Sequence, residues 1–220
     1  MSEADPAKQH LEALTNWLRL STGWLFIDAQ PQRLGVAVSG GGDSMALLDL
    51  MLWQAKQGGF DVCAVTVDHG LRPEAARESL MVAEFCTSKD ISHHVLTWDW
   101  DGQGNLQGRA REARYQLIAE WAGRVGVDTV ALGHTRNDQA ETVLMRLARM
   151  SGVDGLAGMP HAFERHGLRW VRPLLRHRRS DLRKLLQYRN VPWMDDPSNE
   201  DTGFERVRAR NAAHVLEGLG

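Results

Sequence analysis

Short apolar runs alternate along the chain with longer segments of mixed polarity. The runs predict five β-strands, at residues 34–38, 61–67, 91–96, 127–132 and 170–171. The segments between them, and one near the N-terminus, predict helices at 7–20, 43–57, 73–89, 109–124, 137–150 and 180–188. Strands that alternate with helices are typical of βαβ units. The strands lack polar alternation, so we expect a five-stranded parallel, doubly wound α/β sheet with helices on both faces.

The loops that follow the strands are the first places to look for chemistry. In open α/β sheets, ligands bind at the carboxyl ends of the strands, near the point where the strand order reverses. Here those loops are 39–44, 68–73, 97–108 and 133–138.

The loop after the first strand reads Ser39-Gly40-Gly41-Gly42-Asp43-Ser44. Glycines let the backbone adopt positive φ and approach a ligand closely. The N–H groups of such a loop and of the helix that follows form an anion site. Asp43 would repel a phosphate unless a cation lay between them, so the loop predicts Mg²⁺ bridging Asp43 and a pyrophosphate.

Three other motifs can be compared with this loop. A Walker A loop needs a Gly-Lys pair, which the chain lacks, and the dinucleotide fingerprint needs a third glycine that is missing here. Gly42-Asp43-Ser44-Met45-Ala46 is similar to a nucleophile elbow with alanine in the last place. A hydrolase with Ser44 as its nucleophile therefore stays open at this point.

The loop resembles the PP-loop signature of N-type ATP pyrophosphatases, which cleave ATP to AMP and pyrophosphate. Further segments occur in a fixed order, and together they resemble the catalytic domain of the tRNA(Ile)-lysidine synthetases over about residues 34–211. These segments are Val67-Asp68-His69-Gly70-Leu71-Arg72, Gly108 to Tyr115, Gly133 to Thr142, Met145-Arg146-Leu147, Gly155-Leu156, Arg172-Pro173-Leu174-Leu175 and Asp195 to Asn199. In three places the chain departs from the family pattern, with Asn137 for an aspartate, Met150 for a glycine and Val207 for an asparagine.

The resemblance implies an adenine nucleotide alpha hydrolase-like fold and a C–N ligase. In this family ATP adenylates the 2-carbonyl oxygen of the wobble cytidine in a tRNA(Ile) with anticodon CAU. Lysine then attacks through its ε-amine, giving lysidine, AMP and pyrophosphate. By the same resemblance, ATP would contact the residues of the first loop together with two others, and Asp43 would hold Mg²⁺. These nucleotide-binding residues are Ser39, Gly40, Gly41, Gly42, Asp43, Ser44, Val67 and His134.

Residues at the starts of two later helices are candidates for catalysis. The attacking amine must be neutral, so an acid should lie near it. Asp138 follows the fourth strand, where it can face the first loop, and Glu141 lies three residues further on. A charge that complements the helix dipole explains Asp138 equally well without the resemblance. Arg111 and Arg114 share a helix face, which suits a phosphate.

Composition is compatible with a nucleic-acid partner but does not by itself favour one. The net charge of −2 combines 14 acidic and 8 basic residues in 1–110 with 14 acidic and 18 basic residues in 111–220. Of the 26 basic residues 22 are arginine, which binds phosphate bidentately, although a GC-rich genome also explains this bias. Within the basic half we expect Arg206, Arg208 and Arg210 to contact RNA.

Cysteine content and hydropathy predict the cellular location of the protein and weaken one alternative function. Cys63 and Cys86 form neither a disulfide framework nor a CxxC motif, which favours a reducing, cytoplasmic setting. No run of 18 apolar residues is present, so no membrane partner is expected. A tRNA thiolase of the same fold typically needs paired cysteines, which makes it a weaker alternative. A non-catalytic nucleotide- or RNA-binding module also remains open.

We expect three regions, namely an N-terminal helical lead-in at 1–33, the catalytic domain at 34–211 and the start of a linker at 212–220. Family members usually carry further C-terminal domains for tRNA recognition, which are absent here, so the chain is expected to be truncated or a minimal member. Expected partners are tRNA(Ile) with a CAU anticodon and free lysine, and a homodimer is a possible assembly.

Overall fold

The computed structural model describes residues 6–26, 30–68, 70, 74–99, 106–150, 156–195 and 205–217. Parts of the family-like segments, at 69, 71–72, 155 and 196–199, lie outside the described residues. Among the residues that the structure describes, no helix is long and apolar enough to cross a bilayer.

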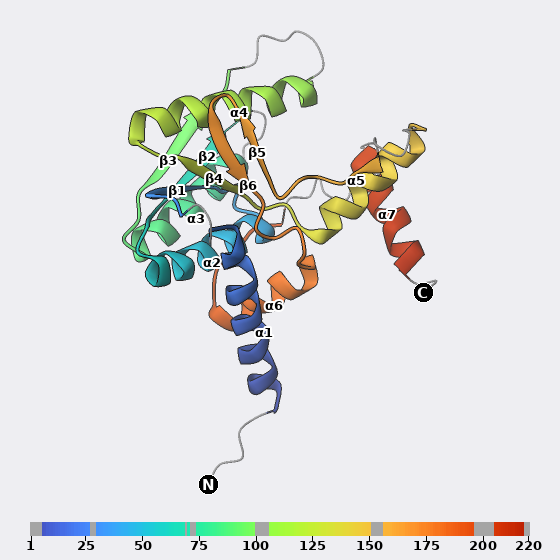
Figure 1. Cartoon of the computed structure of the whole chain (residues 1–220), viewed down its shortest axis with the longest axis horizontal. Coiled ribbons are helices and arrows are strands. Elements are labelled where there is room, and N and C mark those ends of the chain that lie inside the picture. The colour runs from blue at the N-terminus through green and yellow to red at the C-terminus, as the bar shows by residue number, and fades with distance from the viewer. Residues whose placement is uncertain are drawn as a thin grey trace.

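A single sheet of six strands forms the centre of the molecule, in the order β3-β2-β1-β4-β6-β5 (Figure 1). Each strand lies parallel to its neighbours except the edge strand β5, which runs antiparallel to β6. The strands are β1 (Arg33–Ala37), β2 (Asp61–Asp68), β3 (His93–Thr97), β4 (Thr129–Leu132), β5 (Ala162–Arg165) and β6 (Leu168–Val171). The α/β class and the mainly parallel sheet are confirmed, whereas the strand number is six rather than five.

The strand missed from the sequence, β5, forms a hairpin with β6. Its two connecting residues, His166 and Gly167, both have positive φ, at 52° and 68°. Such a pair is typical of the tight turn that joins antiparallel strands. Along β5 the side chains alternate between exposed and half-buried, because the strand lies at the edge of the sheet. The sequence prediction was based on buried apolar runs, which an edge strand does not show.

Helices cover both faces of the sheet. One face carries α1 (Pro6–Thr22), α2 (Gly42–Gly58), α3 (Glu74–Ser88) and α6 (Arg179–Arg189), and α4 (Leu106–Val125) covers the other (Figure 1). A short 3-10 helix, η1 (Gly23–Phe26), follows α1. Helix α1 packs against α2 and α6, so the N-terminal lead-in belongs to the same layer as the predicted catalytic domain.

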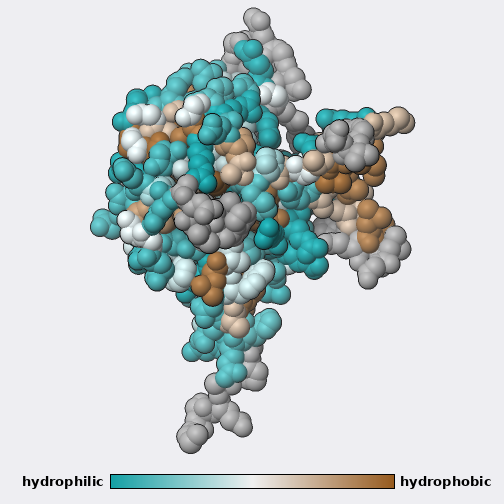
Figure 2. Space-filling model, viewed as in Figure 1, coloured by the Kyte–Doolittle hydropathy of each residue, from teal (hydrophilic) through white to brown (hydrophobic). Residues whose placement is uncertain are grey.

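Helices α5 (Arg136–Ala148) and α7 (Glu205–Glu217) pack against each other and project from one side of the sheet (Figure 1). Figure 2 shows hydrophobic residues gathered on this projection. Leu147 is 57% exposed because α5 leaves the sheet there. The proposed domain end at residue 211 lies inside α7.

The strand order reverses between β1 and β4. From β1 the chain moves outward through β2 and β3, and it then returns to place β4 on the other side of β1. The loops that follow β1 and β4 therefore diverge from neighbouring points at the carboxyl edge of the sheet, which is where a ligand is expected.

Candidate active site

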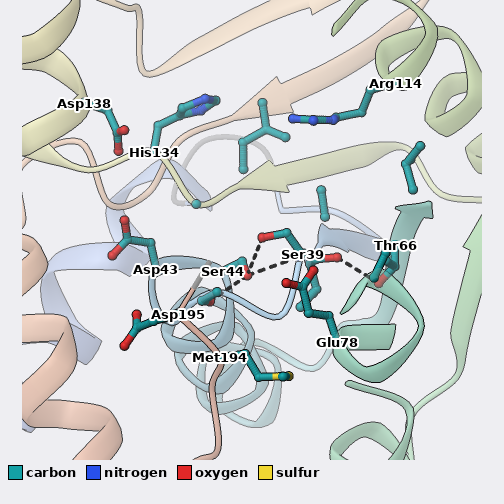
Figure 3. Close-up of a pocket in the computed structure, with 18 of the residues that line it drawn as sticks. Ser39, Asp43, Ser44, Thr66, Glu78, Arg114, His134, Asp138, Met194 and Asp195 are labelled. Atoms are coloured by element: carbon teal, nitrogen blue, oxygen red, sulfur yellow. Dashed lines mark hydrogen bonds between the residues drawn. The ribbon is translucent and has the colours of Figure 1, made fainter. Parts of the chain in front are cut away.

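The loop after β1 lies at one wall of a cavity of about 900 Å³ (Figure 3). Gly40 has φ of +83°, a conformation that favours glycine. Gly41 is the N-cap of α2 and no side chain caps this helix N-terminus. The first turn of α2 therefore offers backbone N–H groups and the positive end of the helix dipole to an anion in the cavity.

The two serines of the loop hold it in shape. Ser44 Oγ donates to the carbonyl of Gly41 at 2.8 Å and accepts from the backbone N–H of Ser39 at 3.2 Å. The two hydroxyls, Ser39 Oγ and Ser44 Oγ, are 3.3 Å apart (Figure 3). Ser44 is a residue of α2 and does not have positive φ, so it is not at the strained turn of a nucleophile elbow. The geometry thus disfavours the Ser44 hydrolase.

The loop after β4 crosses directly over this first loop. A Cβ on Gly133 would lie 3.1 Å from Ser44 Cα and 3.2 Å from the carbonyl oxygen of Asp43, so a side chain there would push the two loops apart by a few tenths of an ångström. This contact brings His134 and the start of α5 into the cavity wall beside Asp43. The third segment that meets the loop comes from after α6, where the N–H of Met194 donates to the carbonyl of Gly40 at 3.0 Å.

Asp43 is half-buried, and its carboxylate has only part of its hydrogen-bond partners. Its Oδ2 accepts from Arg179 Nε at 2.7 Å, while its Oδ1 is buried with no hydrogen-bond partner among the described residues. Burial raises the pKa of Asp43 above its ordinary value, against the opposing charge and hydrogen bond of Arg179. A buried carboxylate oxygen that lacks a partner at the edge of an anion site fits a cation ligand.

Asp138 is fully engaged at the start of α5. Its Oδ2 accepts from the N–H and the hydroxyl of Thr135, both at 2.7 Å, which forms a capping box. Its Oδ1 accepts from Arg206 Nη2 at 2.8 Å and from Arg179 Nη2 at 3.4 Å. Burial alone would raise the pKa of Asp138, but the charges of Arg206 and Arg179 and the Thr135 hydrogen bonds outweigh it, so the pKa lies below its ordinary value.

Glu141, one turn further along α5, completes a buried charge cluster. It is 1% exposed, and it accepts from Arg206 Nε at 2.7 Å and from Arg210 Nε at 2.8 Å. Arg179 Nη1 lies 3.7 Å from Glu141 Oε1, so one guanidinium reaches all three carboxylates of the site. Neither Glu141 nor Arg179 was among the predicted site residues; the three-residue spacing from Asp138 was the signal for Glu141.

Asn137, which departs from the family pattern, has a positional role. Its Oδ1 accepts from the backbone N–H of Arg179 at 3.0 Å and so ties the start of α5 to the start of α6. The substitution therefore leaves the carboxylates of the cluster in place.

His134 lines the cavity wall. Arg172 Nε donates to its Nδ1 at 3.2 Å. Burial lowers the pKa of His134 to about 4, with the charges of Arg172, Arg206 and Arg111 acting in the same direction and Asp138 opposing them. His93 and His94 lie on β3, where they contact Thr66 and the Trp121 ring.

The predicted arginines divide into two groups. Arg114 points into the cavity from α4, on the side opposite Asp43 and Asp138 (Figure 3). The described lining includes Val67 but not Arg111, whose guanidinium lies 5.6 Å from the Tyr115 ring. Arg206 and Arg210 line the cavity, one helical turn apart on α7, whereas Arg208 is exposed on another face of that helix. The three expected RNA contacts therefore do not share one surface.

Comparison with known proteins agrees with this arrangement. A family model described as a PP-loop domain matches residues 11–216. The chain belongs to the PP-loop family. Among curated proteins, the PP-loop domain is similar to a tRNA(Ile)-lysidine synthase of Ruegeria pomeroyi, 48% identical over 94% of this chain and 49% of that protein. A tRNA(Ile)-lysidine synthase of Novosphingobium aromaticivorans is 44% identical over 91% of this chain and 61% of that protein.

The PP-loop domain spans about half the length of the curated relatives it matches. Among solved structures it resembles the U34-tRNA thiolase NcsA of Methanococcus maripaludis, with a TM-score of 0.79 over 95% of this chain and 74% of that chain. NMN synthetase of Francisella tularensis gives a TM-score of 0.55 over 97% of this chain and 87% of that chain. Both are 16% identical to this chain, so these likenesses show the fold alone.

The two cysteines do not form a sulfur-transfer site. Cys63 and Cys86 are buried in separate hydrophobic clusters on opposite faces of the sheet. Burial raises the pKa of each thiol to about 11, so neither is a ready nucleophile. This geometry disfavours the thiolase alternative.

Proposed function

We propose that this PP-loop domain ligates lysine to the 2-position of the wobble cytidine of a tRNA(Ile) with anticodon CAU. In the first step the 2-carbonyl oxygen of the cytidine attacks the α-phosphorus of ATP and pyrophosphate leaves. In the second step the ε-amine of lysine attacks carbon 2, AMP leaves with the carbonyl oxygen, and the amine loses a proton. The names of the curated relatives support lysidine formation as the class of reaction.

The observation that carries the proposal is the position of Arg179. Its guanidinium contacts Asp43 of the phosphate-binding loop and also Asp138 and Glu141 of α5. A nucleotide on the loop and an amine at the α5 carboxylates would therefore lie within the span of one side chain. This proximity is what two successive steps on one carbon atom require, because holding the reactants together removes most of the entropic cost of their encounter.

Each wall of the cavity has a part in the proposed reaction. Ser39, Ser44 and the three glycines between them would cradle the pyrophosphate with backbone N–H groups, and Val67, Arg114 and His134 would contact the rest of the nucleotide. Asp43 would hold Mg²⁺ through its unpartnered Oδ1. The metal, when bound, would neutralise charge that develops on the leaving pyrophosphate. Within the described residues no group of three side chains forms a metal site, so phosphate oxygens and water would complete the coordination.

The acidic cluster would position lysine rather than act as a strong base. Asp138 has a lowered pKa and every oxygen engaged, so it is a poor proton acceptor and a good fixed negative charge. An ammonium ion could replace Arg179 against Asp138 and Glu141 at no net change in the charge of the cluster. The ammonium ion would pass its proton to water in the open cavity as it leaves these contacts, and the neutral amine would then attack carbon 2.

The test is incubation with ATP, Mg²⁺, labelled lysine and a tRNA(Ile) that carries a CAU anticodon. We expect label in the RNA only when ATP is present, with one AMP formed per lysine. A matched tRNA with a different wobble base serves as the control and should remain unlabelled. ATP binding without pyrophosphate release in the complete mixture would favour the nucleotide-binding module instead.

A further inference from the structure

Arg172 is a buried cation in an unusual setting. It lies directly after β6 and is 4% exposed, and no ion pair joins it to a carboxylate in the part of the chain that the structure describes. Its Nη1 donates to the carbonyl of Pro160 at 2.8 Å, and its guanidinium carbon lies 4.2 Å from the centre of the Phe163 ring. Burying a charge without a counterion is costly. Tyr115 also forms a side-chain hydrogen bond with Arg172. Of these polar contacts, the one with His134 lies at the cavity wall, where it can serve the site.

The contact between Arg172 and His134 determines the tautomer of the imidazole. A guanidinium has donors only, so the Nδ1 atom that it contacts must be an unprotonated acceptor. A neutral His134 then carries its proton on Nε2. The alternative, a proton on Nδ1, would place two donors against each other.

The surroundings of His134 also keep the ring neutral. The charged groups that act on it come from four elements, namely Asp138 of α5, Arg172 after β6, Arg206 of α7 and Arg111 of α4. Three of these four are cations, and the ring is buried, so a second proton is disfavoured. His134 is therefore suited to donate a hydrogen bond at neutral pH and unsuited to exchange protons as an acid or base.

We propose that Arg172 is a positioning residue that fixes His134 as the Nε2–H tautomer, so that the ring presents a permanent donor to a phosphate oxygen of the nucleotide. The choice of a phosphate oxygen rests on the proposed function and on the position of His134 beside the phosphate-binding loop. The tautomer itself does not depend on that function, because it follows from contacts within the ligand-free protein.

The test is nitrogen-15 NMR of histidine-labelled protein, with the signals of His134 assigned from a His134→Gln variant. In the wild type we expect Nδ1 unprotonated and Nε2 protonated from pH 8 down to about pH 5. In Arg172→Met we expect a mixture of tautomers and a titration midpoint that rises by about one unit or more. Arg172→Lys, which restores a donor, should return the ring to the Nε2–H form.

The tautomer of His134 and its contact with a phosphate oxygen are tested separately. Arg124→Met removes an exposed arginine at the end of α4 and should leave the His134 signals unchanged. A wild-type ring with its proton on Nδ1 would overturn the proposal, even if Arg172→Met failed to fold. An Arg172→Met spectrum identical to that of the wild type would also overturn it. So would an Arg172→Lys spectrum identical to that of Arg172→Met. ATP should shift the wild-type Nε2 proton; no shift would overturn the phosphate contact, whatever the outcome of the lysine-transfer assay.

Discussion

The first turns of α2 and α5 each carry an aspartate that contacts Arg179, half-buried in α2 and buried in α5, and the two carboxylates also differ in their partners and their pKa. Asp43 has an unpartnered oxygen and a raised pKa. Asp138 has both oxygens engaged, by Thr135, Arg206 and Arg179, and a lowered pKa. The same residue type in the first turn of a helix, at the second position in α2 and the third in α5, thus lacks a partner in one case and has all its partners in the other.

The difference indicates that Asp43 and Asp138 have different roles in the cavity. A carboxylate that is buried without its full set of partners destabilises the folded protein and is kept where a ligand completes it. A carboxylate that caps its own helix and pairs with two arginines stabilises the fold and provides a fixed charge. We therefore expect Asp43 to act through what binds it and Asp138 to act through where it holds the amine.

The largest expected effect comes from Asp43→Asn. If Asp43 holds the metal at the leaving group, its loss should slow pyrophosphate release by about 10³-fold, as for loss of a preorganised charge contact elsewhere. The free energy of unfolding should change little, because the variant removes a buried charge together with one Arg179 contact. Urea unfolding beside a pyrophosphate-release assay checks both. A variant that keeps the wild-type release rate would remove Asp43 from the nucleotide site.

Asp138→Asn should behave in the opposite way with respect to stability. Loss of charged hydrogen bonds should lower the free energy of unfolding by about 1–3 kcal/mol at pH 7. The lowered pKa sets the pH dependence: stabilisation by ionised Asp138 is complete above its unfolded pKa of about 3.9 and is lost as pH falls through the lower, folded value. The gap between wild type and variant should therefore narrow below about pH 4. A gap that widened on acidification would contradict the lowered pKa.

Arg206→Ala should affect both stability and activity. It leaves Asp138 and Glu141 with one partner fewer each, which should cost about 1–3 kcal/mol of the free energy of unfolding. Lysine transfer should fall more than ATP binding does, since the nucleotide loop is not touched. Thermal unfolding and the Michaelis constants for ATP and lysine measure these effects. An equal loss of affinity for both substrates would contradict separate roles for the two aspartates.

Arg208→Ala, on the same helix, gives the smallest expected effect and serves as the control for Arg206→Ala. Arg208 is exposed on a different face of α7, so stability and ATP affinity should stay at wild-type values. If Arg208 contacts RNA phosphate, tRNA affinity should fall and its dependence on salt should weaken by about one phosphate contact. Filter binding at several salt concentrations measures both. An unchanged salt dependence would place the RNA elsewhere.

The phosphate-binding loop could be predicted from the sequence and the charge cluster could not. Ser39 to Ser44 are contiguous, and their glycines and hydroxyls determine the local backbone. The cluster joins Asp43, Asp138, Arg179 and Arg206, which are brought together only by the strand order and by the packing of α5 on α7. Helix α7 was not predicted, and without its helical turn Arg206, Arg208 and Arg210 appeared to be equivalent.

The central claim is that one cavity holds two sites, a nucleotide site around Asp43 and an amine site around Asp138. A single-turnover experiment with ATP, Mg²⁺ and CAU-anticodon tRNA(Ile), first without and then with labelled lysine, tests it most directly. The account predicts that Asp138→Asn still releases pyrophosphate but incorporates little lysine, whereas Asp43→Asn fails at pyrophosphate release. Equal loss of both steps in Asp138→Asn, or normal pyrophosphate release in Asp43→Asn, would contradict it.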